Sequence, residues 1–211
     1  MAIPQTSLRY AMGVNMKITR DFYQRTAIEV AKDLLGMVLV CKTEQGITRG
    51  KIVETEAYMG ALDAAAHSYK VKSTRTNIQY GEGGYAYIYL IYGMYYCMNI
   101  VTNEVDIPEV VLLRALEPIE GIDLMKKRRG TDKITNLCSG PGKLCSAMGI
   151  NRDNYGMDLC GDRMYLEKPE DYGLNEIIAS KRINIDYAGE AKDYLWRFTI
   201  KDNKYISVKV K

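Results

Sequence analysis

ITRGKIVETEAY, residues 47–58, predicts a long strand whose two faces carry different chemistry. Successive side chains of a strand point to opposite faces of a sheet. The residues expected on one face are Val53, Thr55, Ala57 and the following Met59. The residues expected on the other face are Ile52, Glu54, Glu56 and Tyr58. We therefore expect two carboxylates to lie side by side on one face of this strand.

The segment upstream of this strand predicts a hairpin partner and a capped helix. Residues 37–42, MVLVCK, are typical of a second strand, and residues 43–46, TEQG, are typical of the turn that joins the two. Farther upstream, residues 26–29 have the T-x-x-E form of a capping box. Apolar residues follow the box at helical spacing, and Gly36 marks the expected end of the helix.

Downstream, residues 85–101 predict a hairpin rich in tyrosine. Six of the twelve residues 85–96 are tyrosine, and Tyr85, Tyr87 and Tyr89 share one face of the first strand. Residues 92–95, YGMY, are expected at the tip, and residues 96–101 form the returning strand. Tyrosine suits half-buried strands, so simple packing is one interpretation. A stacking platform for nucleobases is the other.

The rest of the chain predicts one α+β domain in which strands dominate. We expect a strand at 110–116, helices at 120–129 and 141–148, and a polar loop at 60–84. The last third holds four short strand candidates, which are residues 163–167, 177–184, 196–201 and 205–210. No internal repeat and no linker divides the sequence into two domains.

Composition excludes several classes of protein. The 211 residues are 47% hydrophobic and 26% charged with a net charge of +3, which is typical of a globular chain. The longest mostly apolar run, residues 85–98, is too short and too rich in tyrosine for the roughly 20 apolar residues of a membrane span. The five cysteines form no CxxC pair and His67 is the only histidine, so we expect no metal site. Without a secretory signal, we expect reduced thiols and a cytoplasmic protein.

Arg114 is a charge inside the apolar segment 110–116. An unpaired buried charge is costly, so Arg114 must meet a carboxylate or face a polar cleft. Glu54 and Glu56 are the simplest partners, and a structural ion pair and a functional site are equally open interpretations. The Cα atoms of two residues at this spacing lie roughly 6.5–7 Å apart on a strand, which is compatible with the acid and base of an inverting glycosidase.

Two turns suggest contacts with nucleic acid. Tyr92, at the expected hairpin tip, is either a wedge that enters between base steps or an aromatic folded back on its own hairpin. Residues 138–143, CSGPGK, form a glycine-rich turn before a helix, with Lys143 beside it. Such a turn binds a phosphate or simply starts the helix, and its spacing is not that of a Walker loop. The basic run at 126–129 is a phosphate patch or a solvated face.

Five runs of sequence carry a resemblance to a known family. They are RGKIVETEAYMG (49–60), AAAHS (64–68), YIYLIYGMYYCMNI (87–100), VLLRALEPIEG (111–121) and LCSGPGKLCSAMGIN (137–151). In this order they closely resemble the alkyladenine DNA glycosylases, also called 3-methyladenine DNA glycosylases. The likeness begins at about Lys17, so we expect residues 1–16 to be an N-terminal extension without fixed structure and residues 17–211 to be one glycosylase domain.

The resemblance implies a fold and a reaction. The fold would be a curved, mostly antiparallel and barrel-like sheet with flanking helices and a protruding hairpin. The enzyme would be a monofunctional glycosylase, a monomer without cofactor or metal, that flips alkylated purines such as 3-methyladenine out of double-stranded DNA. It would hydrolyse the N-glycosidic bond and leave an abasic site, and the resemblance leaves deaminated purines open. In a bacterium the enzyme would lie at the nucleoid.

Roles for individual residues follow from the matching motifs. Glu56 corresponds to the general base that activates the attacking water, and Arg114 corresponds to the arginine beside that water. Glu54 gains no catalytic role from the family and is interpreted as structural. The resemblance implies binding roles for Tyr58, His67 and Tyr89 around the flipped base, for Asn99 against the 2-amino group of guanine, and for Tyr92 as the intercalating residue.

Two other functions remain open at this point. A non-catalytic nucleic-acid-binding module would use the tyrosine face to hold bases, and it would need neither an activated water nor a wedge. A carbohydrate glycosidase would need both Glu54 and Glu56, and the turn at Lys143 would then have no role. We rank the DNA glycosylase first, with Lys143 as a candidate contact to the DNA backbone.

Overall fold

The fold is built on one antiparallel sheet. A computed structural model describes residues 16–170, 172–173 and 176–210, and in this part of the chain nine strands form a single sheet. The strands are β1 (Met16–Lys17), β2 (Val38–Thr43), β3 (Gly46–Tyr58), β4 (Ala86–Ile91), β5 (Tyr95–Thr102), β6 (Glu109–Glu120), β7 (Met164–Lys168), β8 (Ile177–Ser180) and β9 (Arg197–Ile200).

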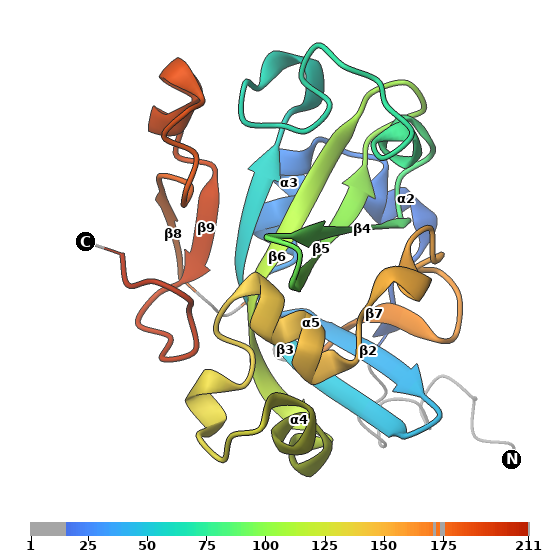
Figure 1. The fold of residues 1–211 in the computed structure, drawn as a ribbon, viewed down its shortest axis with the longest axis vertical. Coiled ribbons are helices and arrows are strands. Elements are labelled where there is room, and N and C mark those ends of the chain that lie inside the picture. Colours follow the sequence, from blue (N-terminus) through green and yellow to red (C-terminus); the bar gives the residue numbers. More distant parts are fainter. Residues whose placement is uncertain (1–15, 171, 174–175, 211) are drawn as a thin grey trace, which may run out of the picture.

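Short helices flank the sheet (Figure 1). The α-helices are α2 (Arg20–Tyr23), α3 (Ala27–Asp33), α4 (Ile122–Arg129) and α5 (Pro141–Met148). The 3-10 helices are η1 (Gly60–Leu62), η2 (Asn77–Tyr80), η3 (Ile134–Asn136), η4 (Arg152–Asn154) and η5 (Gly189–Asp193). The expected single α+β domain with flanking helices is confirmed.

Strand β3 is the branch point of the sheet. The main order is β1-β7-β2-β3-β6-β5-β4, and β9, which carries β8, also pairs with β3. All of these pairings are antiparallel, as expected. The described part of the sheet stays open and does not close into a barrel, with β1 and β4 at the ends of the main order. Because β3 meets three strands, its side chains lie where three parts of the sequence converge.

A β-bulge changes the predicted faces of β3. The pairing of β3 with β6 shifts register between Ile52 and Glu54 and again between Glu54 and Thr55. As a result, both Ile52 and Val53 lie in the hydrophobic core. The prediction that Ile52 shares a face with Glu54 is therefore wrong, because an alternating pattern does not reveal a bulge.

The predicted helix start at Thr26 is confirmed. Thr26 and Glu29 form a reciprocal capping box, in which the Thr26 Oγ1 accepts from the Glu29 amide at 3.4 Å and the Glu29 carboxylate accepts from the Thr26 amide at 3.2 Å. The buried face of α3 packs into the core, and the Ala31 carbonyl accepts a hydrogen bond of 2.8 Å from Thr55 of β3. Helix α3 therefore packs on the face of β3 that carries Thr55, and Glu54 and Glu56 lie on the opposite face.

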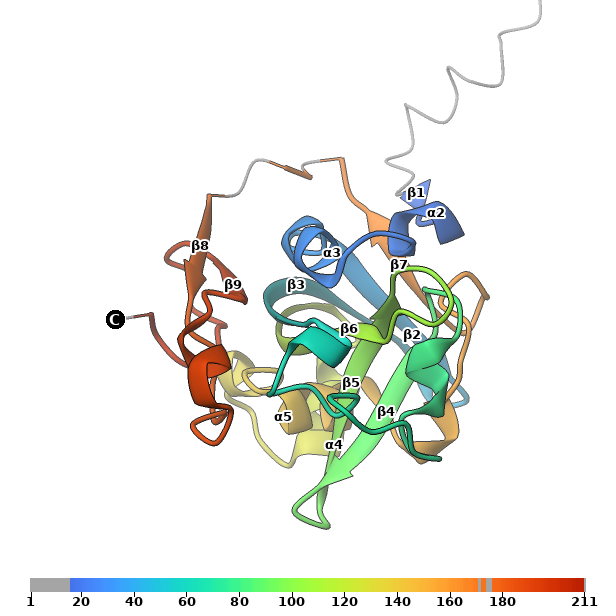
Figure 2. The same cartoon turned by 90° about the horizontal axis from the view of Figure 1, so that it is seen from above.

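The predicted hairpin is confirmed as β4 and β5. Ala86 and Ile88 face the core, whereas Tyr87 and its neighbours on the alternate positions form a separate cluster. Figure 2 shows the tip extending beyond the body of the protein. Tyr92 and Gly93 both have positive φ, 53° and 66°, which is the backbone form of a tight hairpin turn.

The end of the chain differs from the prediction. Residues 205–210 are described and contain no strand. Their polar backbone groups bind side chains instead of a neighbouring strand, since the Ser207 amide donates to Glu54 and the Val208 carbonyl accepts from Arg197. Strand β8 is also shorter than the predicted 177–184, because it pairs only with the four residues of β9.

The predicted N-terminal extension falls mostly outside the description. Met16 lies in β1, which pairs with β7, and residues 1–15 lie outside the described residues. Among the described helices, none is long and apolar enough to cross a bilayer.

Removing the cap of α3 should weaken the domain. Thr26→Ala deletes the side chain that satisfies the Glu29 amide, and we expect the free energy of unfolding to fall by about 1 kcal/mol in a urea titration. Thr74→Ala, at an exposed threonine in the loop before η2, is the matched control and should leave the midpoint unchanged. Equal stability of the two variants would contradict a contribution from the capping box.

Candidate active site

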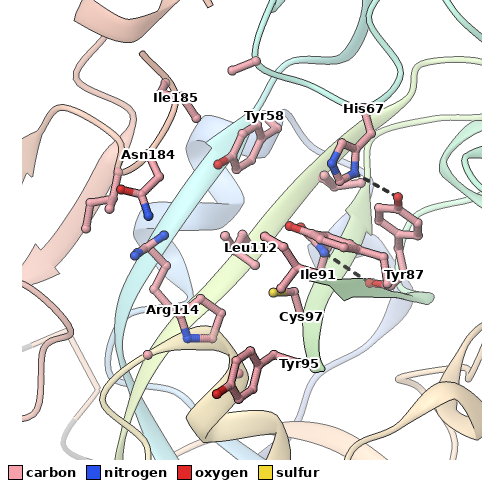
Figure 3. A pocket seen from close by; sticks show the side chains of 18 of the residues that line it. Tyr58, His67, Tyr87, Ile91, Tyr95, Cys97, Leu112, Arg114, Asn184 and Ile185 are labelled. Carbon is pink, nitrogen blue, oxygen red and sulfur yellow. Dashed lines mark hydrogen bonds between the residues drawn. The ribbon is translucent and has the colours of Figure 1, made fainter. Parts of the chain in front are cut away.

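A cleft of about 510 Å³ opens on the face of the sheet that carries the two glutamates. Its walls come from the β4–β5 hairpin, β6, the segment 183–187 and the start of α5. Figure 3 shows its labelled residues, which are Tyr58, His67, Tyr87, Ile91, Tyr95, Cys97, Leu112, Arg114, Asn184 and Ile185. The aromatic lining suits a flat ligand.

Three predicted base-binding residues meet at this cleft. Tyr58, His67 and Tyr89 all line it, from β3, the 60–84 loop and β4. The His67 and Tyr89 rings meet edge to face, with centroids 4.6 Å apart. Burial raises the pKa of the Tyr89 hydroxyl well above its ordinary value, so the ring stays neutral. Residues distant in sequence thus form one aromatic wall.

The tyrosine face of β4 is mostly packed rather than open. Tyr87 is only 1% exposed, and its ring lies 5.5 Å from that of Tyr89. Its hydroxyl is hydrogen-bonded to His67 Nδ1 at 3.0 Å (Figure 3). A platform of three exposed rings, which the binding-module hypothesis requires, therefore does not exist on this face.

Arg75 supports this wall from the loop. Its Nε donates to the Tyr87 hydroxyl at 3.1 Å, and its Nη2 lies 3.0 Å from both ring nitrogens of His67. Its guanidinium also lies 4.9 Å from the centroid of the Tyr89 ring. Burial, together with the charge of Arg75, lowers the pKa of His67 from 6.5 to about 4. His67 is therefore neutral at neutral pH.

Arg114 lies between the two glutamates of β3, so the expected pairing is confirmed. Its Nε is 3.1 Å from Glu54 Oε1, and its Nη1 is 3.3 Å from Glu56 Oε2. Neither carboxylate has any exposed surface. Burial lowers the pKa of Arg114, but Glu56 and Glu54 raise it more, so the pKa ends above its ordinary value. The guanidinium stays charged at the wall of the cleft, where it points toward Asn184 (Figure 3).

A second arginine balances the second carboxylate. Arg197 of β9 donates from Nε to Glu54 Oε1 at 2.7 Å, and its side chain is buried. Glu54, Glu56, Arg114 and Arg197, here called the buried ion cluster, carry no net charge together. Glu54 binds both arginines deep in the sheet, and neither Glu54 nor Glu56 is among the residues that line the cleft, so the two carboxylates do not flank it as the acid and base of a carbohydrate glycosidase would.

Tyr58 connects the aromatic wall to the ion cluster. Its hydroxyl donates to Glu56 Oε2 at 2.8 Å. Burial and the charge of Glu56 raise its pKa well above the ordinary value, so the hydroxyl remains a donor. The guanidinium of Arg182 covers the Tyr58 ring at 4.7 Å and binds Asp63 as a buried ion pair. Tyr58 is therefore held from both sides.

The predicted wedge stands at the rim of the cleft. Tyr92 is 75% exposed at the hairpin tip and lines the opening. With this exposure the side chain is not covered by its own hairpin, so the geometry fits the wedge interpretation, and the role of Tyr92 as a wedge stays a prediction.

Asn99 and Lys143 complete the predicted set. Asn99 lines the cleft from β5, and its Nδ2 donates to the Tyr87 carbonyl at 3.2 Å, which fixes the amide. Lys143 lines the cleft at the start of α5, and its Nζ donates to Asn136 Oδ1 at 2.6 Å. Arg129, the last residue of α4, also lines the cleft. The glycine-rich turn therefore borders the cleft.

The cysteines do not form a reactive centre. Cys41, Cys97, Cys138 and Cys145 are free and buried, and Cys160 is free and partly buried. Burial raises the pKa of each of these thiols. Among the described residues, no group of three His, Cys, Asp or Glu side chains lies close enough to hold a metal ion.

The sequence does not single out Arg75, Arg182 or Arg197. Arg197 stands between Trp196 and Phe198 in a predicted strand, which is the same signal that identifies Arg114. Arg182 falls within the predicted strand 177–184, but it stands beside Ser180 and Lys181 and not among apolar residues, so the same rule does not find it. Arg75 stands in a polar loop among Ser and Thr residues, where a basic residue is unremarkable.

Comparisons with known proteins identify the family of this chain. A family model described as methylpurine-DNA glycosylase matches residues 21–204. A protein of Clostridium novyi (strain NT) is 55% identical over 203 residues, which cover 92% of this chain and 99% of the relative. Proteins of Clostridium acetobutylicum and Alkaliphilus oremlandii are 52% and 53% identical, over 92% of this chain and 98% and 100% of each relative.

All three relatives bear the name "Putative 3-methyladenine DNA glycosylase". The family match spans most of the chain, including the strands that carry Glu56 and Arg114 and the hairpin that carries Tyr92. This chain belongs to the methylpurine-DNA glycosylase family.

Proposed function

We propose that this protein removes alkylated purines, above all 3-methyladenine, from double-stranded DNA by hydrolysing the N-glycosidic bond. The observation that carries the proposal is the pairing of Glu56 with Arg114 at the wall of an aromatic cleft of about 510 Å³. One carboxylate beside an aromatic cleft suits water attack at the sugar carbon that bears the base. Family membership supports the same reaction.

Glu56 has room for one more hydrogen bond, which we assign to the attacking water. Its Oε2 accepts from Tyr58 at 2.8 Å and from Arg114 at 3.3 Å. Its Oε1 accepts from the Ile183 amide at 2.8 Å. A carboxylate has about four lone-pair positions, so Oε1 retains one of them. Glu56 itself has no exposed surface and does not line the cleft, but Ile183, whose amide binds this oxygen, and Asn184 do. We propose that the attacking water approaches Glu56 Oε1 from their side of the cleft.

The reaction needs only one proton acceptor. As the water oxygen bonds to C1′ of the sugar, its proton passes to Glu56, and the electrons of the C1′–N bond leave with the purine. A purine alkylated at N3 or N7 is cationic and departs as a neutral molecule. General-base help contributes about 10²–10⁴ to the rate, and positioning supplies much of the rest. A deaminated purine such as hypoxanthine is neutral and would need a proton from elsewhere.

The aromatic wall would select the base. We propose that Tyr58 and Tyr89 stack on the flipped purine, because an electron-poor alkylated ring stacks well on electron-rich aromatic faces. His67 would contact the purine as a neutral donor or acceptor, in keeping with its lowered pKa. Asn99, fixed by its bond to the Tyr87 carbonyl, would crowd the 2-amino group of normal guanine.

The rim would hold the duplex. Tyr92, exposed at the tip, would fill the space that the flipped nucleotide leaves, and Lys143 would contact a backbone phosphate. We propose a monomer without metal or cofactor, which leaves an abasic site without cutting the strand. It would act on DNA in the cytoplasm.

Glu56→Gln tests the proposal directly. We expect wild-type protein to release 3-methyladenine from methylated duplex DNA without added metal, and the variant to be slower by at least about 100-fold, because glutamine does not accept the proton of water. Retained binding to the same DNA, measured by fluorescence anisotropy, would show that the variant folds. Glu104→Gln, at an exposed glutamate, is the control and should match wild type. A Glu56→Gln variant as fast as wild type would rule out this mechanism.

Tyr92→Ala tests the wedge. Loss of the ring should weaken binding to lesion-containing duplex about 10-fold or more, because nothing then fills the space that the flipped nucleotide leaves. Binding to undamaged duplex should change little. Met94→Ala removes another exposed side chain of the same tip and serves as the matched control. Equal losses on damaged and undamaged DNA would assign Tyr92 to general DNA binding instead.

The titration of His67 tests the electrostatics of the pocket. The pKa of His67 is lowered from 6.5 to about 4, so the ring should be neutral at every pH well above 4 and gain charge only in acid. As His67 is the only histidine, a single set of imidazole NMR signals reports its titration. Arg75→Gln should move the midpoint upward, and Lys70→Gln, an exposed cation of the same loop, should not. A wild-type midpoint near 6.5 would contradict this environment.

A further inference from the structure

The buried ion cluster is closed on one side by the segment 205–210. Glu54 accepts four hydrogen bonds, two from arginines and two from Ser207. The Ser207 hydroxyl lies 2.8 Å from Glu54 Oε1, and the Ser207 amide donates to Glu54 Oε2. A single residue of an irregular segment therefore contacts both oxygens of a fully buried carboxylate.

Ser207 also contacts the arginine of the proposed catalytic pair. Its hydroxyl oxygen accepts from Arg114 Nη2 at 3.4 Å. The segment around it is anchored independently, because the Val208 carbonyl accepts from Arg197, and Tyr205 and Ile206 pack against the core. The hydroxyl thus bridges Glu54 and Arg114 from a fixed backbone.

These contacts divide the donors of Arg114 among three acceptors. Its Nε binds Glu54, its Nη2 binds Ser207, and its Nη1 alone binds Glu56. A guanidinium that no other acceptor constrains frequently pairs with a carboxylate through two nitrogens at once. Such a fork on Glu56 would engage both of its oxygens and cover the position that we assign to water.

We propose that Ser207 is a positioning residue, which acts with Glu54 to hold the Arg114 guanidinium so that only one of its nitrogens engages Glu56. The inference rests on the proposed function, because it assigns a purpose to that geometry. It also gives Glu54 a role beyond structure, as the competing acceptor that leaves Glu56 free for water. The segment 205–210 then belongs to the catalytic centre although it does not line the cleft.

Ser207→Ala is the appropriate test, because it keeps every charge of the cluster. Glu54→Gln would leave two buried arginines facing one carboxylate, and that variant could fail to fold. The matched control is Ser180→Ala, since the Ser180 hydroxyl accepts from Arg197 Nη1 at 3.4 Å and contacts neither Arg114 nor Glu54. Ser207→Thr, which restores a hydroxyl, is the rescue variant.

Activity is measured as single-turnover release of 3-methyladenine, beside the Kd for the same duplex and the Tm. We expect Ser207→Ala to slow release about 3- to 10-fold, the effect of one lost hydrogen bond, with Kd unchanged. Ser180→Ala should lose a similar amount of Tm but no rate, and Ser207→Thr should recover most of the rate. A rate loss shared by both alanine variants, or a change in Kd alone, would overturn the positioning role.

A second readout is independent of activity. In wild type and Ser180→Ala, the buried Arg114 Nε–H should exchange slowly with solvent in NMR spectra, and in Ser207→Ala it should exchange faster. Unchanged exchange in Ser207→Ala would overturn the proposal. If wild type released no purine, the proposed function would fail, and this exchange measurement would still decide whether Ser207 holds Arg114.

Discussion

The burial of two carboxylates and two guanidinium groups inside one sheet is the constraint on which the rest of the structure depends. Each charge alone would be costly to remove from water, and removing one partner of such a cluster typically costs about 3–5 kcal/mol. The four groups come from β3, β6 and β9, so these strands must meet in one register. The bulge in β3 serves this register, since it turns Ile52 and Val53 toward the core while Glu54 and Glu56 keep the other face.

The cluster also determines what the cleft can do. Its two carboxylates and two guanidinium groups balance in formal charge, and only Arg114 of the four is among the residues that line the cleft. The wall above it is aromatic, with His67 uncharged and the hydroxyls of Tyr58 and Tyr89 protonated, and the Arg75 guanidinium packs against it from the loop. A pocket of this kind offers stacking surface, and under the proposed function Glu56 would be its proton acceptor.

Several features of the fold and of the candidate site can be predicted from the sequence, because they depend on residues that are close together in the chain. The capping box at Thr26, the hairpin around Tyr92 and the need of Arg114 for a carboxylate follow from backbone geometry and the cost of burial. The bulge at Ile52 and the contacts of Arg75 do not, because they arise from strands and loops that meet only in the folded chain. The segment 205–210 has the composition of a strand, but backbone groups of it form hydrogen bonds with the side chains of Arg197 and Glu54. The spacing of apolar residues in the sequence does not reveal such bonds.

The contact of Glu54 with Ser207 has a consequence for the order of folding. The two residues are 153 positions apart, so their contact closes one of the longest loops in the chain. Long loops cost more entropy to close and tend to form late. A ribosome would release most of the sheet before residue 207 emerges, and until then the cluster would lack two of its donors. The buried ion cluster is therefore complete only after residue 207 has been synthesised, later than the β4–β5 hairpin.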